Sequence, residues 1–282
     1  MIEPDTKFAI VGLGVLGGSY VQALSKKGYC CIGIDIDEEA IQYAMKNHWI
    51  AEGGTDSSLI QKADIVISCL YPHVFVQWVK ENQKYFKTGA LLSDVTGIKR
   101  EIIRDINAEL REDVEFIACH PMAGREFKGI QYADAARFAN ANFIIVPTAE
   151  NTPEAIASAH QLAEILGFTK IAQLTAEEHD RMIGFLSQLT HVIAVSLMNV
   201  SDNTHLVDYT GDSFRDLTRI AKINEDMWPE LFELNKDNLI REINEFSQEL
   251  LRFRDLLAEN DTEGMKEKMI QSTERRKKFD KS

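Results

Sequence analysis

The chain carries Lys7-Phe-Ala-Ile-Val-Gly-Leu-Gly-Val-Leu-Gly17, a short apolar run followed by glycines in the pattern G-x-G-x-x-G. The apolar run predicts a strand, and the residues beyond it have the spacing of a helix. Gly12 permits a tight turn, Gly14 lets a pyrophosphate approach the backbone, and Gly17 lets helix and strand pack closely. The helix would offer its free N–H groups and positive dipole end to the phosphates. This stretch therefore predicts a dinucleotide-binding β-α-β unit.

An acidic residue stands at the end of the next apolar run, Cys30–Ile34. The carboxylate of Asp35 can accept hydrogen bonds from the adenosine ribose hydroxyls, and it would repel a 2′-phosphate. Asp37 adds a second negative charge nearby. We therefore expect NAD rather than NADP. FAD enzymes and some regulatory proteins use the same fingerprint, so it does not by itself establish hydride transfer.

The rest of the first half alternates short apolar runs with helix-length segments. This alternation is typical of a parallel sheet covered by helices on both faces, so we predict an α/β, Rossmann-like, doubly wound fold. The expected strands are Phe8–Val11, Cys30–Ile34, Ile65–Cys69, Leu91–Ser93, Phe116–Cys119, Phe143–Val146 and Ile171–Leu174.

The character of the sequence changes near Leu174, beyond which there is little strand signal. Thr175-Ala-Glu-Glu178 reads as a capping box that opens a long helix. Pro229 fits the first turn of another helix, along which Leu231 to Leu257 recur at helical spacing. We expect a dinucleotide-binding domain over residues 1–174 and an all-α domain over residues 175–282. Long helices this apolar often pack against a second copy, which suggests a homodimer.

The composition limits the classes of partner. A formal net charge of -13 disfavours nucleic acid and anionic membranes, so an anionic substrate would need a local basic pocket. The spacing of the four cysteines fits neither a zinc site nor a disulfide framework. A reducing, cytoplasmic compartment follows, and we expect neither a signal peptide nor a membrane span, because no stretch approaches roughly 18 apolar residues.

Several polar residues follow the expected strands, where ligands of open parallel sheets bind. Tyr71-Pro72 follows the third expected strand, and Ser93-Asp94 closes the fourth; for each of them ordinary loop structure is as plausible as contact with the cofactor. His120 follows Phe116–Cys119, and histidine is the usual general base near neutral pH. Its position favours a catalytic role over a structural one. We expect Cys119 to be core, because strand neighbours point to opposite faces.

Two further patterns lie in the helical half. Asp180, Gly184, Ser187 and His191 are spaced by four, three and four, which places a polar stripe on one helix face, turned either to solvent or to a lined cavity. Metal binding is not expected, because His179 lies on another face. Phe214-Arg-Asp-Leu-Thr-Arg-Ile-Ala221 places two arginines among apolar residues, which suggests a buried ion pair or an anion site.

In this order, the motifs resemble prephenate dehydrogenase. The resemblance rests on the glycine fingerprint, the His-Pro-Met-Ala-Gly-x-Glu run at residues 120–126, Ser187-x-Leu-x-His191, and the run 214–221 followed by Met227-Trp228. It spans about Phe8 to Asn235. It implies oxidative decarboxylation of prephenate to 4-hydroxyphenylpyruvate with NAD, and a Rossmann-like domain followed by a helical dimerisation domain.

The resemblance also implies roles for individual residues. His120 matches the catalytic histidine that hydrogen-bonds the substrate's ring hydroxyl, and Arg219 matches the arginine that holds a substrate carboxylate. His191 matches a histidine of the substrate pocket, and Glu126 and Trp228 match residues near its rim. The expected substrate-binding set is Arg219, His191, Glu126, Ser187 and Trp228. The expected cofactor-binding set is Gly12, Leu13, Gly14, Val15, Leu16, Gly17, Asp35, Tyr71, Pro72, Ser93 and Asp94.

The sequence departs from the family pattern at two places. Gly97 stands where many members have a serine that assists the catalytic histidine, so that support is absent or comes from Thr96 or elsewhere. Asp212-Ser213 replaces a glycine pair, which leaves the choice between prephenate and arogenate open. Arogenate dehydrogenase is therefore one alternative function, and a non-catalytic NAD-sensing protein is another.

Overall fold

The computed structural model describes residues 1–124, 127–202 and 204–279, and the chain forms two compact units, Met1–Asn235 and Lys236–Ser282. This division falls later than Leu174, where the sequence changes character. The reason is packing, because Ala176 and Met182 contact the apolar cluster on one face of the sheet. By packing, the segment 175–235 therefore belongs with the sheet.

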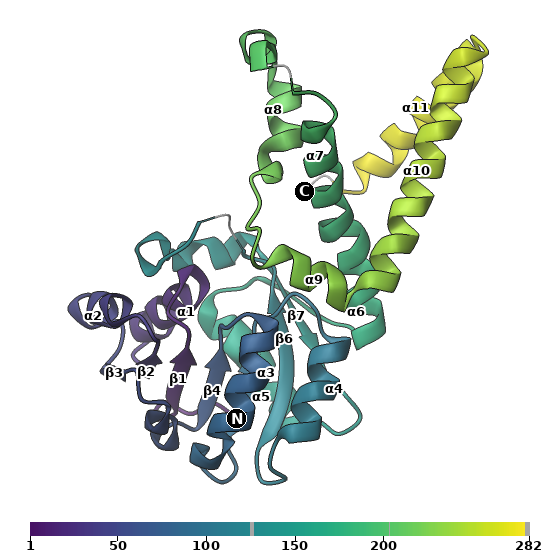
Figure 1. Ribbon diagram of the computed structural model, residues 1–282. Coiled ribbons are helices and arrows are strands. Elements are labelled where there is room, and N and C mark those ends of the chain that lie inside the picture. Colours follow the sequence, from purple (N-terminus) through teal and green to yellow (C-terminus); the bar gives the residue numbers. More distant parts are fainter. Residues whose placement is uncertain (125–126, 203, 280–282) are drawn as a thin grey trace. The chain divides into compact units, whose positions relative to one another are not determined.

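The first unit is built on an eight-stranded sheet with the order β3-β2-β1-β4-β5-β6-β7-β8 (Figure 1). Its strands are β1 (Lys7–Val11), β2 (Cys30–Ile34), β3 (Glu52–Gly54), β4 (Ile65–Ser68), β5 (Leu91–Asp94), β6 (Glu115–Pro121), β7 (Asn142–Val146) and β8 (Lys170–Gln173). Neighbouring strands pair in parallel, except β6 with β7. This mostly parallel sheet confirms the expected fold class.

Two features of the sheet differ from the expectation. The short strand β3 was missed because Glu-Gly-Gly has no apolar alternation. The strands β6 and β7 are antiparallel rather than parallel. A parallel pair needs a long crossover, usually a helix. The described part of this connection holds only the short turns η3 (Ile130–Tyr132) and η4 (Ala135–Asn140), so the chain returns in the opposite direction.

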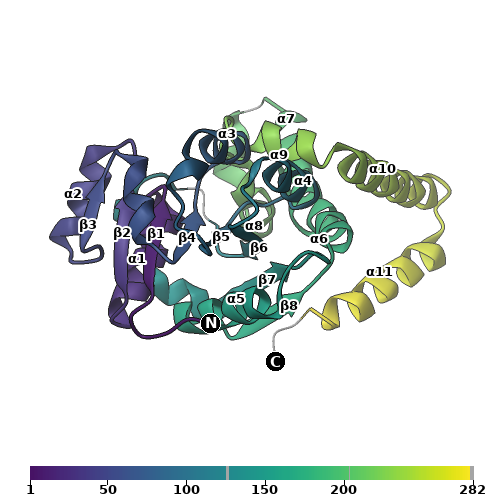
Figure 2. The same ribbon diagram turned by 90° about the horizontal axis from the view of Figure 1, so that it is seen from below.

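Helices cover both faces of the sheet (Figure 2). One apolar cluster joins the sheet to α1 (Val15–Lys26), α2 (Glu38–Lys46) and α5 (Pro153–Leu166), and a second joins it to α3 (Pro72–Asn82) and α4 (Arg100–Glu109). Consecutive residues of β4 illustrate the pattern, since Ile65 and Ile67 belong to the first cluster and Val66 to the second. Both faces are thereby removed from water, which explains the continuous apolar strands.

A continuous helical segment follows the sheet. It consists of α6 (Ala176–Ile183), the π-helical turn η5 (Gly184–Leu189) and α7 (Thr190–Asn199). The capping box at its start is confirmed, because Thr175 and Glu178 bond each other's backbone N–H. The expectation of no membrane-length apolar stretch was wrong, since residues 176–199 are long and apolar enough to span a bilayer. One such helix is weak evidence for a span, because the core helices of soluble proteins pass the same test.

The described remainder is helical. It contains η6 (Thr204–Tyr209), α8 (Asp212–Thr218), η7 (Arg219–Ala221), α9 (Trp228–Leu234), α10 (Lys236–Ala258) and α11 (Thr262–Lys277), besides the turns η1 (Ser57–Lys62) and η2 (Gln83–Tyr85) in the first half. Pro229 lies in the first turn of α9, as expected. The single helix expected beyond it is broken at Asn235, whose side chain bonds the carbonyl of Asp180 and the side chain of Gln188. Within the second unit, a Lys268–Glu249 ion pair joins α11 to α10.

Candidate active site

The glycine loop between β1 and α1 has the shape that a pyrophosphate requires. Gly12 has φ +91°, a backbone conformation that other residues rarely adopt. A Cβ at Gly17 would overlap the carbonyl oxygen of Gly12, whereas a Cβ at Gly14 would meet nothing within 4 Å. No side chain caps the start of α1. The loop is therefore tight inside and open at Gly14, where a ligand phosphate would approach the helix N-terminus.

Asp35 is half-buried beside this loop. Its two carboxylate oxygens accept the backbone N–H of Leu13 and of Asp37. A carboxylate oxygen has two acceptor sites, so each keeps capacity for a ribose hydroxyl. The side chain of Leu13 is buried, while Val15 and Leu16 are half-buried. The carboxylate of Asp37 caps α2 through the N–H of Glu39.

The loops after β4 and β5 were also expected to line the cofactor site. Tyr71 is exposed, and its hydroxyl accepts a hydrogen bond from Asn224. Pro72 is buried in the first turn of α3. Ser93 and Asp94 are both buried, and Ser93 donates to the carbonyl of Ile117 at 2.9 Å. Contact of these four residues with a cofactor stays a prediction, and three of the four side chains, those of Tyr71, Ser93 and Asp94, are hydrogen-bonded within the protein.

Asp94 is the centre of a buried polar cluster. Its Oδ1 accepts the N–H of Cys119 at 3.0 Å, and its Oδ2 accepts the Lys99 ammonium at 2.6 Å and the hydroxyl of Thr96. Neither Asp94 nor Lys99 is accessible to solvent. The backbone N–H of Lys99 in turn donates to Asp180, 2.8 Å away. The cluster thereby joins β5, β6 and α6.

His120 lies near the carboxyl end of β6 and is half-buried. Its Nδ1 is 2.9 Å from Nε2 of His179, whose Nδ1 is 2.8 Å from Oδ1 of Asp180. Burial lowers the pKa of His120 well below its ordinary value, and the nearby His179 and Lys99 lower it further. His120 is therefore a neutral ring near pH 7. Cys119 is buried as expected, and burial raises the pKa of its thiol to about 12.

The expected polar stripe does not form one face. Asp180 and Gly184 are buried, whereas Ser187 and His191 are half-buried. The π turn between them holds more residues than an α turn and so rotates the later residues relative to the earlier ones. Asp180 consequently accepts the backbone N–H groups of residues 99 and 100 at the start of α4.

His191 and Trp228 do lie together. Their ring centroids are 3.8 Å apart, and the His191 ring bonds the carbonyl of Ser187 at 2.8 Å. α9 thereby packs Trp228 against the helix that holds His191. On the same helix α9, Leu231 lies about 3.7 Å from where a Cβ at Gly97 would stand. These contacts bring three of the expected substrate-binding residues, 187, 191 and 228, to one place.

The two arginines after Phe214 are exposed, so a buried ion pair, one of the two expectations, was wrong. α8 is a short helix with no buried residue. Arg215 pairs with Asp212 at 3.1 Å, and Arg219 begins η7. Glu126, expected near the rim of the pocket, lies outside the described residues.

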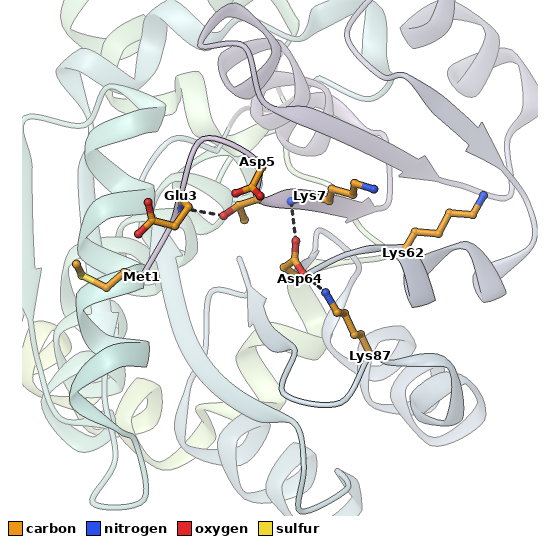
Figure 3. Close-up of a pocket in the computed structure, with 8 residues that line it drawn as sticks. Met1, Glu3, Asp5, Lys7, Lys62, Asp64 and Lys87 are labelled. Carbon is orange, nitrogen blue, oxygen red and sulfur yellow. Dashed lines mark hydrogen bonds and ion pairs between the residues drawn. The ribbon is translucent and has the colours of Figure 1, made fainter.

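A depression of about 460 Å³ lies at the opposite edge of the sheet (Figure 3). Its walls come from residues just before or at the start of β1, β4 and β5, including Lys7, Asp64 and Lys87. Asp64 accepts both the backbone N–H of Lys7 and the ammonium of Lys87. Because it faces the amino ends of the strands, it is not the site built around His120. Among residues 1–124, 127–202 and 204–279, no group of three or more His, Cys, Asp or Glu side chains could hold a metal ion.

Comparisons with known proteins show the family of the chain. The family model described as the nucleotide-binding domain of prephenate dehydrogenase matches residues 21–171, and that of its dimerisation domain matches residues 175–271. The prephenate dehydrogenase of Bacillus subtilis is 27% identical over 267 residues, covering 91% of this chain and 71% of that protein.

Two solved structures have the same fold. The prephenate dehydrogenase of Aquifex aeolicus, in complex with hydroxyphenyl propionate and NAD+, is 26% identical with a TM-score of 0.90, covering 98% of each chain. An arogenate dehydrogenase from Synechocystis is 24% identical with a TM-score of 0.84, covering 98% of this chain and 100% of that one. Relatives with either activity in their names thus share the fold.

The two loop glycines should respond differently to an added methyl group. Gly17→Ala forces an overlap with backbone, which costs about 1–3 kcal/mol and lowers the thermal midpoint by about 2–4 °C for each kcal/mol. Gly14→Ala should fold with nearly the parental midpoint, yet bind NAD at least about tenfold more weakly, because its Cβ occupies the open side of the loop. Thermal unfolding and calorimetric titration measure the two effects. Parental affinity in Gly14→Ala would place the pyrophosphate elsewhere.

Proposed function

The chain belongs to the prephenate dehydrogenase family, and from that premise we propose that it oxidises prephenate with NAD to 4-hydroxyphenylpyruvate and carbon dioxide. The observation that carries the proposal is the position of His120. It is a neutral, half-buried imidazole at the carboxyl edge of the sheet, the edge that also holds the loop Gly12–Gly17. A proton acceptor on the same edge of the sheet as a dinucleotide loop is what removal of hydride from an alcohol carbon needs.

We assign the cofactor to the loop after β1. The open side at Gly14 and the uncapped start of α1 would hold the pyrophosphate, and Asp35 would accept the ribose hydroxyls. When bound, the nicotinamide supplies a hydride acceptor. The negative charge of Asp35 disfavours a 2′-phosphate, so NAD is preferred over NADP.

The reaction follows from the flow of charge. Nε2 of His120 takes the proton of the ring hydroxyl while a hydride leaves the ring carbon that bears this hydroxyl. The ring carboxylate then departs as carbon dioxide, and the electrons of the broken C–C bond complete an aromatic phenol. Aromaticity makes the step effectively irreversible. His120 returns this proton to the ring oxygen as the ring becomes aromatic, so the phenol keeps its O–H hydrogen and the base is neutral again.

The substrate carries two carboxylates, and the protein carries a formal net charge of -13. Local cations are therefore needed to attract and hold the anionic substrate. We propose that Arg219 holds one carboxylate, because a guanidinium can bond both of its oxygens. His191 and Trp228, whose rings are in contact at an angle of 33°, would form one wall of the pocket beside Ser187. Glu126 is retained as a rim residue from the resemblance alone.

We propose that the protein is a homodimer in the cytoplasm. The second family model describes a dimerisation domain, which this chain matches over residues 175–271. Apolar side chains that a partner could cover lie exposed on its described helices, among them Phe185, Met198, Leu217, Leu250 and Ile270. A dimer interface would also explain why the segment 176–199 is apolar enough to span a membrane, because burial between two subunits would remove its surface from water.

Arogenate dehydrogenase is the second candidate function. Arogenate differs from prephenate in carrying an amine on the side chain in place of a ketone, so the ring chemistry at His120 is the same for both. The observation that favours it is the pair Asp212-Ser213 before the arginine run, because the Asp212 side chain is almost fully exposed and adds negative charge near Arg215. A cationic amine would tolerate such a charge better than a ketone would.

Formation of NADH in the presence of each substrate tests the proposed function. We expect prephenate with NAD to give 4-hydroxyphenylpyruvate and NADH in equal amounts, at a kcat/KM at least about tenfold above that for arogenate or for NADP, which is a difference of about 1.4 kcal/mol. A preference for arogenate would establish the second candidate. Absence of turnover on both substrates would leave a non-catalytic NAD-binding protein.

Removal of Arg219 should weaken binding of substrate more than turnover. A charge-assisted hydrogen bond contributes about 1.5–3 kcal/mol, so Arg219→Ala should raise the KM for prephenate by roughly 10- to 100-fold. Arg215→Ala is the matched control, because Arg215 is equally exposed and pairs with Asp212. Steady-state kinetics of both variants measure the difference. An unchanged KM in Arg219→Ala would refute its role.

The pH profile reports on His120. Only the neutral ring accepts a proton, and the lowered pKa keeps the ring neutral down to below about pH 6.5. We expect kcat/KM to be flat above that pH and to fall as pH decreases through the pKa of His120. His120→Asn should lose about 10²- to 10⁴-fold in kcat and still bind NAD. Near-parental turnover in His120→Asn would require a different base.

A further inference from the structure

His120, His179 and Asp180 form a row of hydrogen-bonded side chains. The ring nitrogens that join the two histidines are 2.9 Å apart, and the rings meet at 62° with centroids 5.1 Å apart. The other ring nitrogen of His179 lies 2.8 Å from the carboxylate of Asp180. His179 and Asp180 are buried, at 0% and 2% exposure, whereas His120, at the other end of the row, is half-buried.

The positions of the protons on the two histidine rings follow from the carboxylate of Asp180, which accepts hydrogen bonds at one end of the row. Asp180 is fixed as an acceptor, because its two oxygens bond the backbone N–H groups of Lys99 and Arg100 at the start of α4. The nitrogen of His179 that faces it therefore carries a proton. A neutral His179 then presents a lone pair at Nε2, so the facing Nδ1 of His120 carries a proton. The lone pair of His120 is left on Nε2, the nitrogen on the far side of the ring.

The other neighbours that could support His120 are engaged or absent. The hydroxyl of Thr96 bonds Asp94 and the carbonyl of Ile98, and Gly97 has no side chain. Among the described residues, His179 is the hydrogen-bond partner that the structure gives to the His120 ring. The support that the sequence leaves unassigned at Gly97 thus has a physical source elsewhere.

We propose that His179 and Asp180 are positioning residues that hold His120 in the tautomer with its lone pair on Nε2, the nitrogen that takes the substrate's proton. The inference rests on the proposed function in giving His120 the role of base. Burial lowers the pKa of His179, which keeps this ring neutral and its Nε2 an acceptor. Of the charged groups nearby, Lys99 opposes protonation of both rings, while Asp180 and Asp94 favour it at His179.

The tautomer can be measured without substrate. In the ligand-free 282-residue chain labelled with ¹⁵N-histidine, long-range ¹H–¹⁵N spectra at neutral pH should show His120 protonated on Nδ1 and unprotonated on Nε2. His179→Phe keeps a ring but removes the acceptor, so His120 should shift to a mixture of tautomers. His179→Gln keeps an acceptor oxygen and should largely preserve the parental tautomer. The control is His160→Phe, since His160 lies on α5 and bonds Gln173.

The kinetic consequence separates positioning from general damage. His179→Phe and Asp180→Asn should each lower kcat on the order of 10²-fold, with KM for the substrate changed less than about threefold, because only the alignment of the base is lost. His179→Gln should recover most of the lost kcat. If His179→Phe proves unfolded by circular dichroism, the pair His179→Gln and Asp180→Asn decides between the outcomes.

The inference fails if His120 has the opposite tautomer in the parent protein, or if folded His179→Phe and Asp180→Asn keep parental kcat. It also fails if His179→Gln is as impaired as His179→Phe, because that result means that bulk at this position matters and the acceptor does not. Absence of activity on both prephenate and arogenate would refute the proposed function instead. The spectra of the ligand-free protein would still decide whether the row fixes the tautomer.

Discussion

The buried ion pair between Lys99 and Asp94 holds together the segments that form the site. Its two charged groups are 2.6 Å apart, and neither side chain is accessible to solvent. Two buried charges stabilise a fold only when their geometry is good and their remaining hydrogen-bond capacity is used. Thr96 and the N–H of Cys119 satisfy the remaining capacity of Asp94. Removing one partner would leave an uncompensated buried charge, at a cost of about 3–5 kcal/mol. The loop after β5 is therefore fixed relative to the end of β6, where His120 stands.

Features that depend on neighbours in sequence could be predicted from the sequence. The glycine loop, the capping box at Thr175 and the buried strands each depend on residues within a few positions of one another. β3 could not be found, because Glu-Gly-Gly lacks side chains that mark a strand. The direction of β7 depends on the path of the preceding connection, and the break at Asn235 depends on carbonyl and amide groups more than 40 residues earlier. Neither the direction of β7 nor the break at Asn235 can therefore be predicted from a local sequence pattern.

In the candidate site, too, some residues could be predicted from local sequence and others depend on tertiary packing. His120 could be proposed because its place at the end of an apolar strand is a local fact. His179, 59 residues further along, could not be recognised as its partner, since that pairing exists only after α6 packs against the sheet. Lys99 gave no signal either, because an isolated lysine is expected at the surface. A row of acceptor and donor groups converging on one histidine is visible only in three dimensions.

The low basicity of His120 suits this reaction. Burial keeps the ring neutral and ready to accept a proton, but a base with a lowered pKa also gives less driving force for proton transfer. In the proposed reaction, loss of carbon dioxide and formation of an aromatic ring would make the oxidation irreversible, so a weak base would suffice provided that it is aligned. Alignment is what an acceptor at His179, itself held by Asp180, supplies. In the role proposed for His120, the orientation of the base would therefore matter more than its strength.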